Sequence, residues 1–168
     1  GMKLWLSAGW LGLLVLGAVF APWIAPQDPL AQDLFLGRLP PVWVQGAEPG
    51  FYLGTDSLGR DVLSRILYGA RLALIVALVA GTVTCVIGAV LGLMAGFLRG
   101  WVDVVISRAI DIWMAFPPVL FSILLIAVMG PGLLSIILAI VVIDWTRFAR
   151  VVRAEAMAQG AMDYVASA

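Results

Sequence analysis

The chain contains no histidine, one lysine (Lys3) and one cysteine (Cys85). Without histidine it cannot carry a histidine general base, a Ser-His pair or a histidine-ligated metal. A phosphate loop that ends in Lys-Ser or Lys-Thr is also excluded, because Lys3 is followed by Leu4. The single cysteine excludes an internal disulfide, and its apolar neighbours indicate a packing residue rather than a redox centre.

Charged residues are also scarce. They make up 12% of the 168 residues, whereas hydrophobic residues make up 63%. A soluble domain is about half apolar and about a quarter charged, so the excess of apolar residues must face lipid. The ten basic residues balance the ten acidic ones, which argues against nucleic acid as a partner. The composition therefore predicts an all-α, polytopic membrane protein with lipid around it.

Four apolar segments are long enough to cross a bilayer as helices: 4–24, 72–98, 112–129 and 133–149. At about 1.5 Å per residue, each covers most or all of a hydrocarbon layer about 30 Å thick. The last segment carries Asp144 and Arg147 in its final turns, where an arginine can reach the interface. We therefore expect four transmembrane helices.

The distribution of basic residues predicts the orientation. With the N-terminus inside, six basic residues fall on the cytoplasmic side and four fall outside, all within 26–71. Long translocated segments weigh less in this rule, so both ends of the chain are predicted to be cytoplasmic. The expected organisation is a transmembrane helix at 1–25, an extracytoplasmic loop with an amphipathic helix at 26–71, and a transmembrane domain at 72–168.

The stretch LGTDSLGRDVLSRILYGAR, residues 53–71, is the most polar part of the chain. We expect a cap at positions 55–57 and an amphipathic helix after it, with Asp61 and Arg65 paired on the solvated side. The chain then turns through residues 68–70 into the second span. The stretch holds no base, nucleophile or metal set for an active site. An anchor at the membrane surface is the first interpretation, and a contact surface for an external protein is the second.

Two features of the apolar segments point to helix packing and to a bend. Gly81, Gly88, Gly92 and Gly96 lie on one face of the second span, where small residues allow another helix to approach closely. Phe116-Pro117-Pro118 stands where the chain enters the third span, and proline there interrupts the helical hydrogen bonds. This kink has two interpretations, a pathway-lining helix or a simple bend at the interface.

The last stretch, residues 144–168, combines charge with small residues. Three arginines spaced by three, Arg147, Arg150 and Arg153, are expected at the headgroup level, and Arg108 is expected to pair with Asp111. Gly160 is expected to break the helix that follows the arginines. Short helices of small, moderately apolar residues are suited to docking in a groove of a partner protein.

Several motifs occur here in one order. They are the stretch at 53–71, GFLRGWVDVVISRAIDIWMAFP at 96–117, GPG at 130–132, RFARVVRAE at 147–155 and DYVASA at 163–168. Together they resemble the C-type permease subunit of bacterial ABC importers for dipeptides, oligopeptides or nickel. The resemblance covers residues 53–168, and the first span with its proline-rich loop is similar to the N-terminal extension of that family.

The resemblance implies a six-span permease in the bacterial inner membrane, of which this chain holds the N-terminal part. It also implies a second permease subunit, two cytoplasmic ATPase subunits and an extracytoplasmic substrate-binding protein as partners. The chain itself is expected to bind no cofactor, because the ATPase subunits bind ATP. The substrate class, whether dipeptide, oligopeptide or nickel, stays open.

The family couples to its ATPases through a motif written Glu-Ala-Ala with a glycine four residues later. The matching positions here are Ala166, Ser167 and Ala168, preceded by Asp163, Tyr164 and Val165. Alanine stands where the family has glutamate, which removes one polar contact. The resemblance therefore implies an ATPase-coupling interface at 163–168, and an incomplete transmembrane domain at 72–168 that ends inside the motif.

Two other function classes compete with this interpretation. A channel or secondary transporter without ATPases needs ionisable groups near the middle of the membrane, and the first three predicted spans contain none. An intramembrane enzyme needs a base beside its nucleophile, and Ser122 and Ser135 have no evident base. Both therefore rank below the permease, and we expect no enzymatic activity.

Overall fold

The computed structural model describes the backbone of residues 1–166 and the side chains of residues 1–162. Within these residues the chain is almost entirely helical. The helices are α1 (Met2–Val19), α2 (Ala21–Ile24), the 3₁₀ helix η1 (Leu34–Leu36), α3 (Val62–Leu98), α4 (Gly100–Ala115), α5 (Pro118–Met129) and α6 (Leu133–Ala166). The described part holds no strand, only an isolated bridge between Thr55 and Asp61. The prediction of an all-α membrane protein is confirmed.

The predicted spans are confirmed only in part. In residues 1–166, α1 and α3 are each long and apolar enough to cross a membrane. The third predicted span is a pair of helices, α4 and α5, bent by 82° at a short break, and it adds a third crossing only if the pair forms one span. The expected kink at Phe116-Pro117-Pro118 is present, but it divides the predicted span at 112–129 between two helices, because Phe116 adopts an extended conformation and Pro117 follows it.

The fourth predicted span lies in α6, but α6 is not among the described helices that are long and apolar enough to cross a membrane. Three charged residues, Asp144, Arg147 and Arg150, fall near the middle of α6. They shorten its uncharged first part to residues 133–143. The helix also continues past Gly160 to Ala166, so the expected break at Gly160 was wrong. One glycine costs a helix about 1 kcal/mol, and the good helix formers around it offset that cost.

The chain divides into two compact units, residues 1–75 and 76–168, and α3 contributes to both. In the first unit α1 continues into the short helix α2, and Ala18 and Ala21 are buried. The loop at 26–61 follows, and the first turns of α3 complete the unit. A side chain added at Gly17 would lie 3.5 Å from Leu67 Cδ2, so α1 approaches the start of α3 closely.

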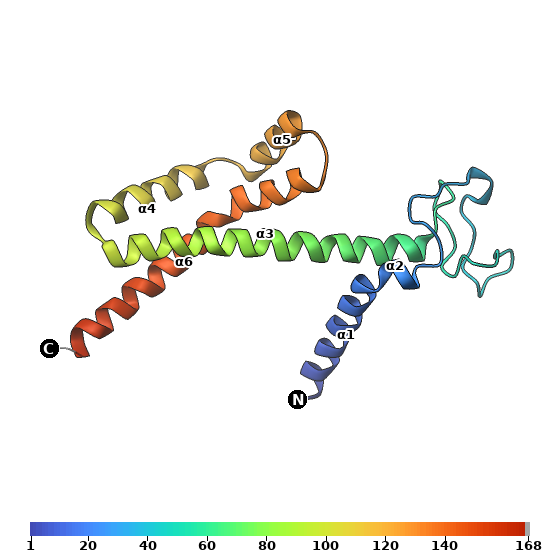
Figure 1. Cartoon of the computed structure of the whole chain (residues 1–168), viewed down its shortest axis with the longest axis horizontal. Coiled ribbons are helices and arrows are strands. Elements are labelled where there is room, and N and C mark those ends of the chain that lie inside the picture. The colour runs from blue at the N-terminus through green and yellow to red at the C-terminus, as the bar shows by residue number, and fades with distance from the viewer. Residues whose placement is uncertain (167–168) are drawn as a thin grey trace. The chain divides into compact units, whose positions relative to one another are not determined.

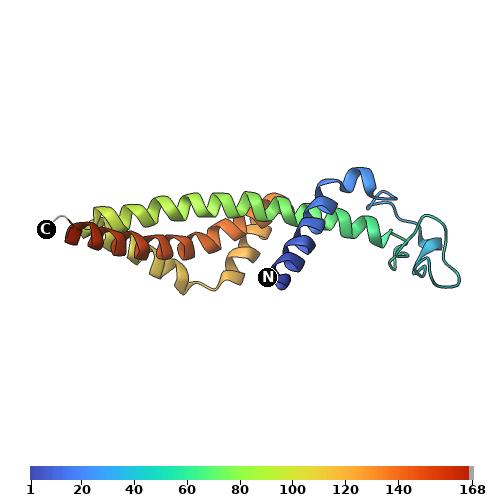
Figure 2. The ribbon, with the colours of Figure 1, turned by 90° about the horizontal axis from the view of Figure 1, so that it is seen from below.

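In the second unit the end of α3 and α6 run side by side, as the two ribbon views show (Figures 1 and 2). The contact face on α3 steps by four residues through Ala80, Thr84, Gly88, Gly92 and Gly96, all of which are buried. Val141, Ala149 and Ala156 are the buried apolar residues of α6. Small side chains on both helices therefore bring the two backbones close together.

The glycines on this face have no room for a side chain. A Cβ atom at Gly92 would lie 2.6 Å from the carbonyl oxygen of Ala149, and one at Gly88 would lie 2.9 Å from its nitrogen. A Cβ atom at Gly96 would lie 2.5 Å from Ala156 Cβ. Gly81 has nothing within 4 Å of that position. Three of the four glycines singled out in the sequence thus meet α6, and Ala80 and Thr84, not Gly81, continue their row.

Alanine substitution separates the packing role of these glycines from their effect on helix propensity. We expect Gly92→Ala to destabilise the protein by about 1–3 kcal/mol, because its Cβ meets backbone that cannot move independently. Gly81→Ala is the matched control on the same helix, and we expect it to stabilise the protein by about 0.5–1 kcal/mol through propensity alone. Denaturant titration in detergent micelles, followed by circular dichroism, measures both. Equal shifts for the two variants would contradict the packing.

Candidate functional site

The part of the second unit with the most specific side-chain contacts is the junction of α4, α5 and α6. Helix α4 runs antiparallel to α6 and is joined to it at three levels, as Figure 1 shows for the backbones. The levels are Asp103 with Arg153, Asp111 with Arg150, and the Trp113 indole with the carbonyl of Val142. These contacts fix α4 along about a third of the length of α6, from Val142 to Arg153.

The Asp103–Arg153 ion pair is the strongest of the three. The guanidinium donates twice to the carboxylate, from Nε to Oδ1 and from Nη2 to Oδ2 at 2.8 Å, and Ser107 Oγ donates to Oδ1 at 3.2 Å. The two side chains are 16% and 30% exposed, so water screens the pair only partly. A bidentate pair in such a place contributes on the order of 1–3 kcal/mol.

The second pair corrects a prediction from the sequence. Asp111 lies 3.4 Å from Arg150 of α6, and no ion pair joins it to Arg108 among the described side chains. Both members of this pair are more than half exposed, so its contribution is small. Arg150 and Arg153 thus face α4, while Arg147 pairs with Asp144 on its own helix at 3.4 Å. The three arginines do not form one surface.

Four aromatic side chains gather beyond the ion pairs. Trp113 donates its Nε1–H to the carbonyl of Val142 at 2.6 Å. Its ring stacks on Phe121 of α5 at 4.9 Å and meets Trp145 of α6 edge-on at 6.0 Å. Phe116, at the end of α4, lies 5.9 Å from Phe121. Because the indole is held by a hydrogen bond and two ring contacts, this aromatic cluster is rigid.

The kink between α4 and α5 lies beside this cluster. Phe116 and Pro117 are extended, and α5 begins at Pro118. The bend leaves a cavity of 180 Å³ on the side of α6, lined by Trp113, Met114, Phe116, Pro118, Phe121, Ile143, Thr146 and Arg147. Phe116 and Pro118 thus border a cavity, whereas Pro117 forms the bend itself. A role in a translocation pathway stays a prediction.

The predicted coupling residues are the last six of the chain. The backbone of Asp163, Tyr164, Val165 and Ala166 continues α6 as a helix. Ser167 and Ala168 lie outside the described residues, as do the side chains of residues 163–166. The contact of this segment with ATPase subunits therefore stays a prediction.

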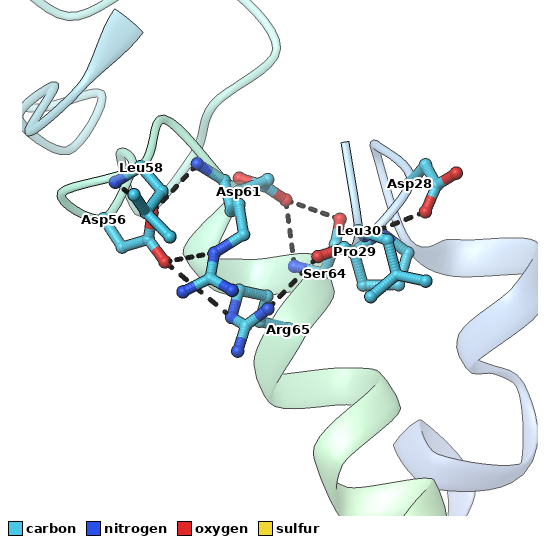
Figure 3. Close-up of polar contacts among 9 residues, drawn as sticks. Asp28, Pro29, Leu30, Asp56, Leu58, Asp61, Ser64 and Arg65 are labelled. Carbon is cyan, nitrogen blue, oxygen red and sulfur yellow. Dashed lines mark hydrogen bonds and ion pairs between the residues drawn. The ribbon is translucent and has the colours of Figure 1, made fainter. Parts of the chain in front are cut away.

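The polar stretch at 53–71 forms a tight turn followed directly by α3. Asp56 Oδ1 accepts from the backbone N–H groups of Leu58 and Arg60 at 2.9 and 3.0 Å, and its Oδ2 lies 2.7 Å from Arg60 Nε (Figure 3). Gly59, within the turn, has φ of +72° and passes so close to Asp33 that no side chain fits. The turn therefore requires both the aspartate and the glycine.

Helix α3 begins at Val62, and its cap is Asp61 rather than a residue at 55–57, so that prediction was wrong. Asp61 Oδ2 accepts from the N–H of Ser64 at 2.9 Å and from its hydroxyl at 2.5 Å. The Ser64 oxygen in turn accepts from the N–H of Gln27 at 3.1 Å. Asp61 is only 1% exposed and therefore does not pair with Arg65 on a solvated surface.

Arg65 contacts other groups than the one expected. Its Nε lies 3.9 Å from Asp56 Oδ2, and its Nη1 donates to the carbonyl of Pro29 at 3.3 Å (Figure 3). Nor does the chain turn at residues 68–70, because α3 continues through them to Leu98. The links from Gln27 and Pro29 to α3 were not predicted, because nothing in the local sequence of either residue indicates a partner about 36 residues away. The stretch thus ties the loop to the start of α3.

Neither region offers catalytic or metal chemistry. Within the described residues, no group of three or more Cys, Asp or Glu side chains is placed to hold a metal ion. The carboxylates at the α4–α6 junction are engaged by arginines, and the cavity beside the kink contains no nucleophile paired with a base. The arrangement can transmit movement between helices and can bind, but it holds no reacting groups.

The α4–α6 ion pairs can be tested by charge reversal. We expect Asp103→Arg to destabilise the protein by about 1–3 kcal/mol, because two guanidinium groups then face each other, and the double variant with Arg153→Asp to recover part of that loss. The exposed pair Asp111 and Arg150 is the matched control, and its reversal should cost about 0–1 kcal/mol. The free energy of unfolding in micelles measures each variant. The ranking is wrong if both reversals cost the same.

The Asp56 turn should open at low pH. The backbone N–H of Arg60, with smaller contributions from the Leu58 N–H and the Arg60 guanidinium, holds the pKa of Asp56 below its ordinary value of 3.8. Because the folded pKa is the lower one, the turn gains stability above the ordinary value and loses it as pH falls through the folded pKa.

Amide hydrogen exchange at Leu58 and Arg60, corrected for intrinsic rates, should show protection falling steeply below about pH 4. The Asp56→Asn variant keeps an oxygen acceptor but no charge, so its protection should not follow pH in this range. Protection that falls equally in both proteins would show that Asp56 does not control the turn.

Comparison with known sequences matches the chain to two families. The model of the family described as "Binding-protein-dependent transport system inner membrane component" matches residues 88–168. That of "N-terminal TM domain of oligopeptide transport permease C" matches residues 4–41. The two matches lie in the order that the family resemblance implied, and they cover α1 and the helices from the end of α3 onward.

Individual relatives agree with these matches. The di/tripeptide transport system permease protein DppC of Pseudomonas aeruginosa is 40% identical over 153 residues, which are 91% of this chain and 50% of that protein. The dipeptide permease DppC of Haemophilus influenzae is 38% identical over 92% of this chain and 52% of its own length. The glutathione permease GsiD of Pectobacterium atrosepticum is 36% identical over 96% of this chain and 52% of its length.

The chain thus spans about half the length of the curated relatives it matches. These relatives are transport permeases and not enzymes. The two family matches, the apolar helices and the identities of 36–40% lead to one assignment. The chain belongs to the C-type permeases among the inner membrane components of binding-protein-dependent transport systems.

Proposed function

We propose that this chain is part of the permease subunit of an ATP-driven ABC importer for short peptides. It contributes to a translocation path that it forms with a second permease subunit. The observation that carries the proposal is the link of α4 to α6 through Arg150 and Arg153. This link joins the kink beside Phe116 to the helix whose last residues, 163–166, begin the proposed coupling segment 163–168.

Short peptides are favoured as the substrate class. Two of the relatives are named for dipeptides or di/tripeptides, and a third is named for glutathione, which is itself a tripeptide. Nickel and longer peptides are the remaining substrates of the C-type permeases that the sequence resembles. A substrate-binding protein outside the membrane delivers the peptide, and it makes most of the selection among these classes.

The mechanism that we propose is alternating access driven by two cytoplasmic ATPase subunits. The ATPases bind ATP, so this chain needs no cofactor of its own. When they close, they displace the coupling segment and with it the end of α6, and the ion pairs carry α4 along. The 82° bend between α4 and α5 is the place where that movement changes the shape of the path. In this proposal both ends of the chain lie on the cytoplasmic side of the inner membrane.

A channel or secondary transporter without ATPases is the alternative. Ion coupling needs ionisable groups at mid-membrane. The buried carboxylate Asp61 does not meet this need because it lies at the start of α3, and Asp103 does not because it is already paired with Arg153. Lys3, the second residue of α1, is the charged residue of that helix, and α3 holds no charged residue after Arg71. Substrate flux in liposomes without any ATPase would favour the alternative.

The coupling assignment is tested by co-purification. We expect the chain, co-expressed with its cognate ATPase subunits, to retain them on an affinity column, and the double variant Asp163→Ala, Tyr164→Ala to lose at least about 90% of that retention. Arg108→Ala, an exposed position on α4, is the matched control and should retain them fully. If the double variant binds the ATPases as well as the control does, residues 163–168 are not the coupling interface.

A further inference from the structure

We propose that the cavity beside the α4–α5 kink is a substrate-contact site for the C-terminal residue of a short peptide. In this site Arg147 binds the terminal carboxylate, and the cavity takes an apolar side chain. The inference rests on the proposed function, because it names the part of the substrate that this chain contacts. Three observations carry it: the size of the cavity, the fixed position of the rings in its wall, and the exposure and weak pairing of Arg147.

The cavity has the size of a side chain. Its volume is 180 Å³, and an apolar cavity of about 150 Å³ in another protein accommodates a benzene molecule. A leucine or phenylalanine side chain therefore fits. The space exists because Pro117 and the extended Phe116 turn α5 away from the axis of α4. It is a consequence of the kink, so a straight helix at this place would close it.

The wall of the cavity is preorganised. Trp113 is held by its hydrogen bond to Val142 and by its stack on Phe121, so two of the lining rings are fixed before a ligand enters. Phe116 completes the aromatic side, and Ile143 of α6 lies opposite. Thr146 and Arg147 supply polar groups beside these apolar side chains. A preorganised pocket that combines apolar walls with a few polar groups is the usual form of a small-molecule site, because little entropy is lost on binding.

Arg147 is the cation at the edge of this cavity, and its side chain is 71% exposed. Its partner Asp144 contacts it at a single distance of 3.4 Å, from Nη1 to Oδ1. Arg153, in contrast, is engaged twice by Asp103, and Arg150 is paired with Asp111 on the next helix. Arg147 is thus the arginine of α6 whose hydrogen-bond donors are most available to a carboxylate, which it can hold bidentately.

An exposed guanidinium beside an aromatic cavity recognises an anion that carries an apolar group. The C-terminal residue of a peptide has this chemistry, since its carboxylate and its side chain leave the same carbon atom. The Asp144 carboxylate competes for the guanidinium, and the peptide carboxylate must displace it. Removing the charge of Asp144 should therefore strengthen binding rather than weaken it, which a merely structural ion pair would not do.

The experiment measures binding of three dipeptides to the purified chain in phosphatidylcholine nanodiscs, by saturation-transfer nuclear magnetic resonance. We expect Gly-Phe to bind at least about fivefold more tightly than Gly-Phe amide, which lacks the carboxylate, and more tightly than Gly-Gly, which leaves the cavity empty. Because these comparisons change the ligand, they do not depend on the folding of any variant. Equal binding of the acid and the amide, or no detectable binding, overturns the proposal.

Three variants and one control variant locate the site. Arg147→Gln should weaken Gly-Phe binding about tenfold and abolish the preference for the acid over the amide, whereas Arg108→Gln, another exposed arginine, should change neither. Asp144→Asn should strengthen binding of the acid. Met114→Trp, which places a large side chain at the cavity, should remove the preference for Gly-Phe over Gly-Gly. Equal effects of Arg147→Gln and Arg108→Gln would count against the site.

A lipid phosphate is the competing anion. Nanodiscs with phosphatidylglycerol should leave Gly-Phe binding within about twofold, and loss of binding that depends on Arg147 would instead assign the site to a lipid headgroup. The proposed function is tested separately in the complete importer. If that importer takes up dipeptides with an unchanged KM when it carries Arg147→Gln, only the site is wrong. If the importer without any substitution takes up no dipeptide, the proposed function fails.

Discussion

The close approach of α3 and α6 is the constraint on which the second unit depends. At Gly88, Gly92 and Gly96 the two helices meet almost backbone to backbone, so α6 cannot rotate or slide without a clash. The apolar contacts there do not need a hydrophobic driving force, which lipid would not supply. Once α6 is fixed in this way, its other faces are available for α4 and α5. The arginines and aromatic residues of α6 then determine where those two helices lie.

Helix α6 thus contributes both to the cavity and to the contact with α4. Its first half holds Ile143 and Arg147 at the cavity beside the kink, and its second half holds Arg150 and Arg153 against α4. Of the charged residues that interrupt the apolar sequence of α6, Arg150 and Arg153 join it to α4, whereas Asp144 and Arg147 pair with each other. In a membrane, charged groups are tolerated where they pair or reach water, and here pairing with Asp103 and Asp111 satisfies two of them. The polar face of α6 is therefore part of the packing.

The local features of the chain were predictable from sequence, and the partners across the fold were not. Periodicity and composition located the helices, and Pro117 located the kink, because both signals lie within a few residues. The cap at Asp61 was missed, because aspartate and serine occur at several adjacent positions and only the tertiary link from Gln27 to Ser64 selects one of them. Asp111 pairs with Arg150 and not with Arg108 for the same reason. Arg108, three residues from Asp111, was a visible candidate in the sequence. Arg150, the actual partner 39 residues away, depends on how α4 packs against α6.

The placement of the cavity on α6 has a consequence for the proposed transport cycle. A ligand held by Arg147 lies on the same helix as the coupling segment, one turn before Arg150, which is paired with α4. Movement of the end of α6 therefore displaces the guanidinium together with α4, and α5 follows because its Phe121 ring stacks on Trp113 of α4. In the proposed cycle the whole cavity then moves with the coupling helix, so that access to the cavity differs between the two states. Such a difference is what an ATP-driven cycle needs in order to release its substrate.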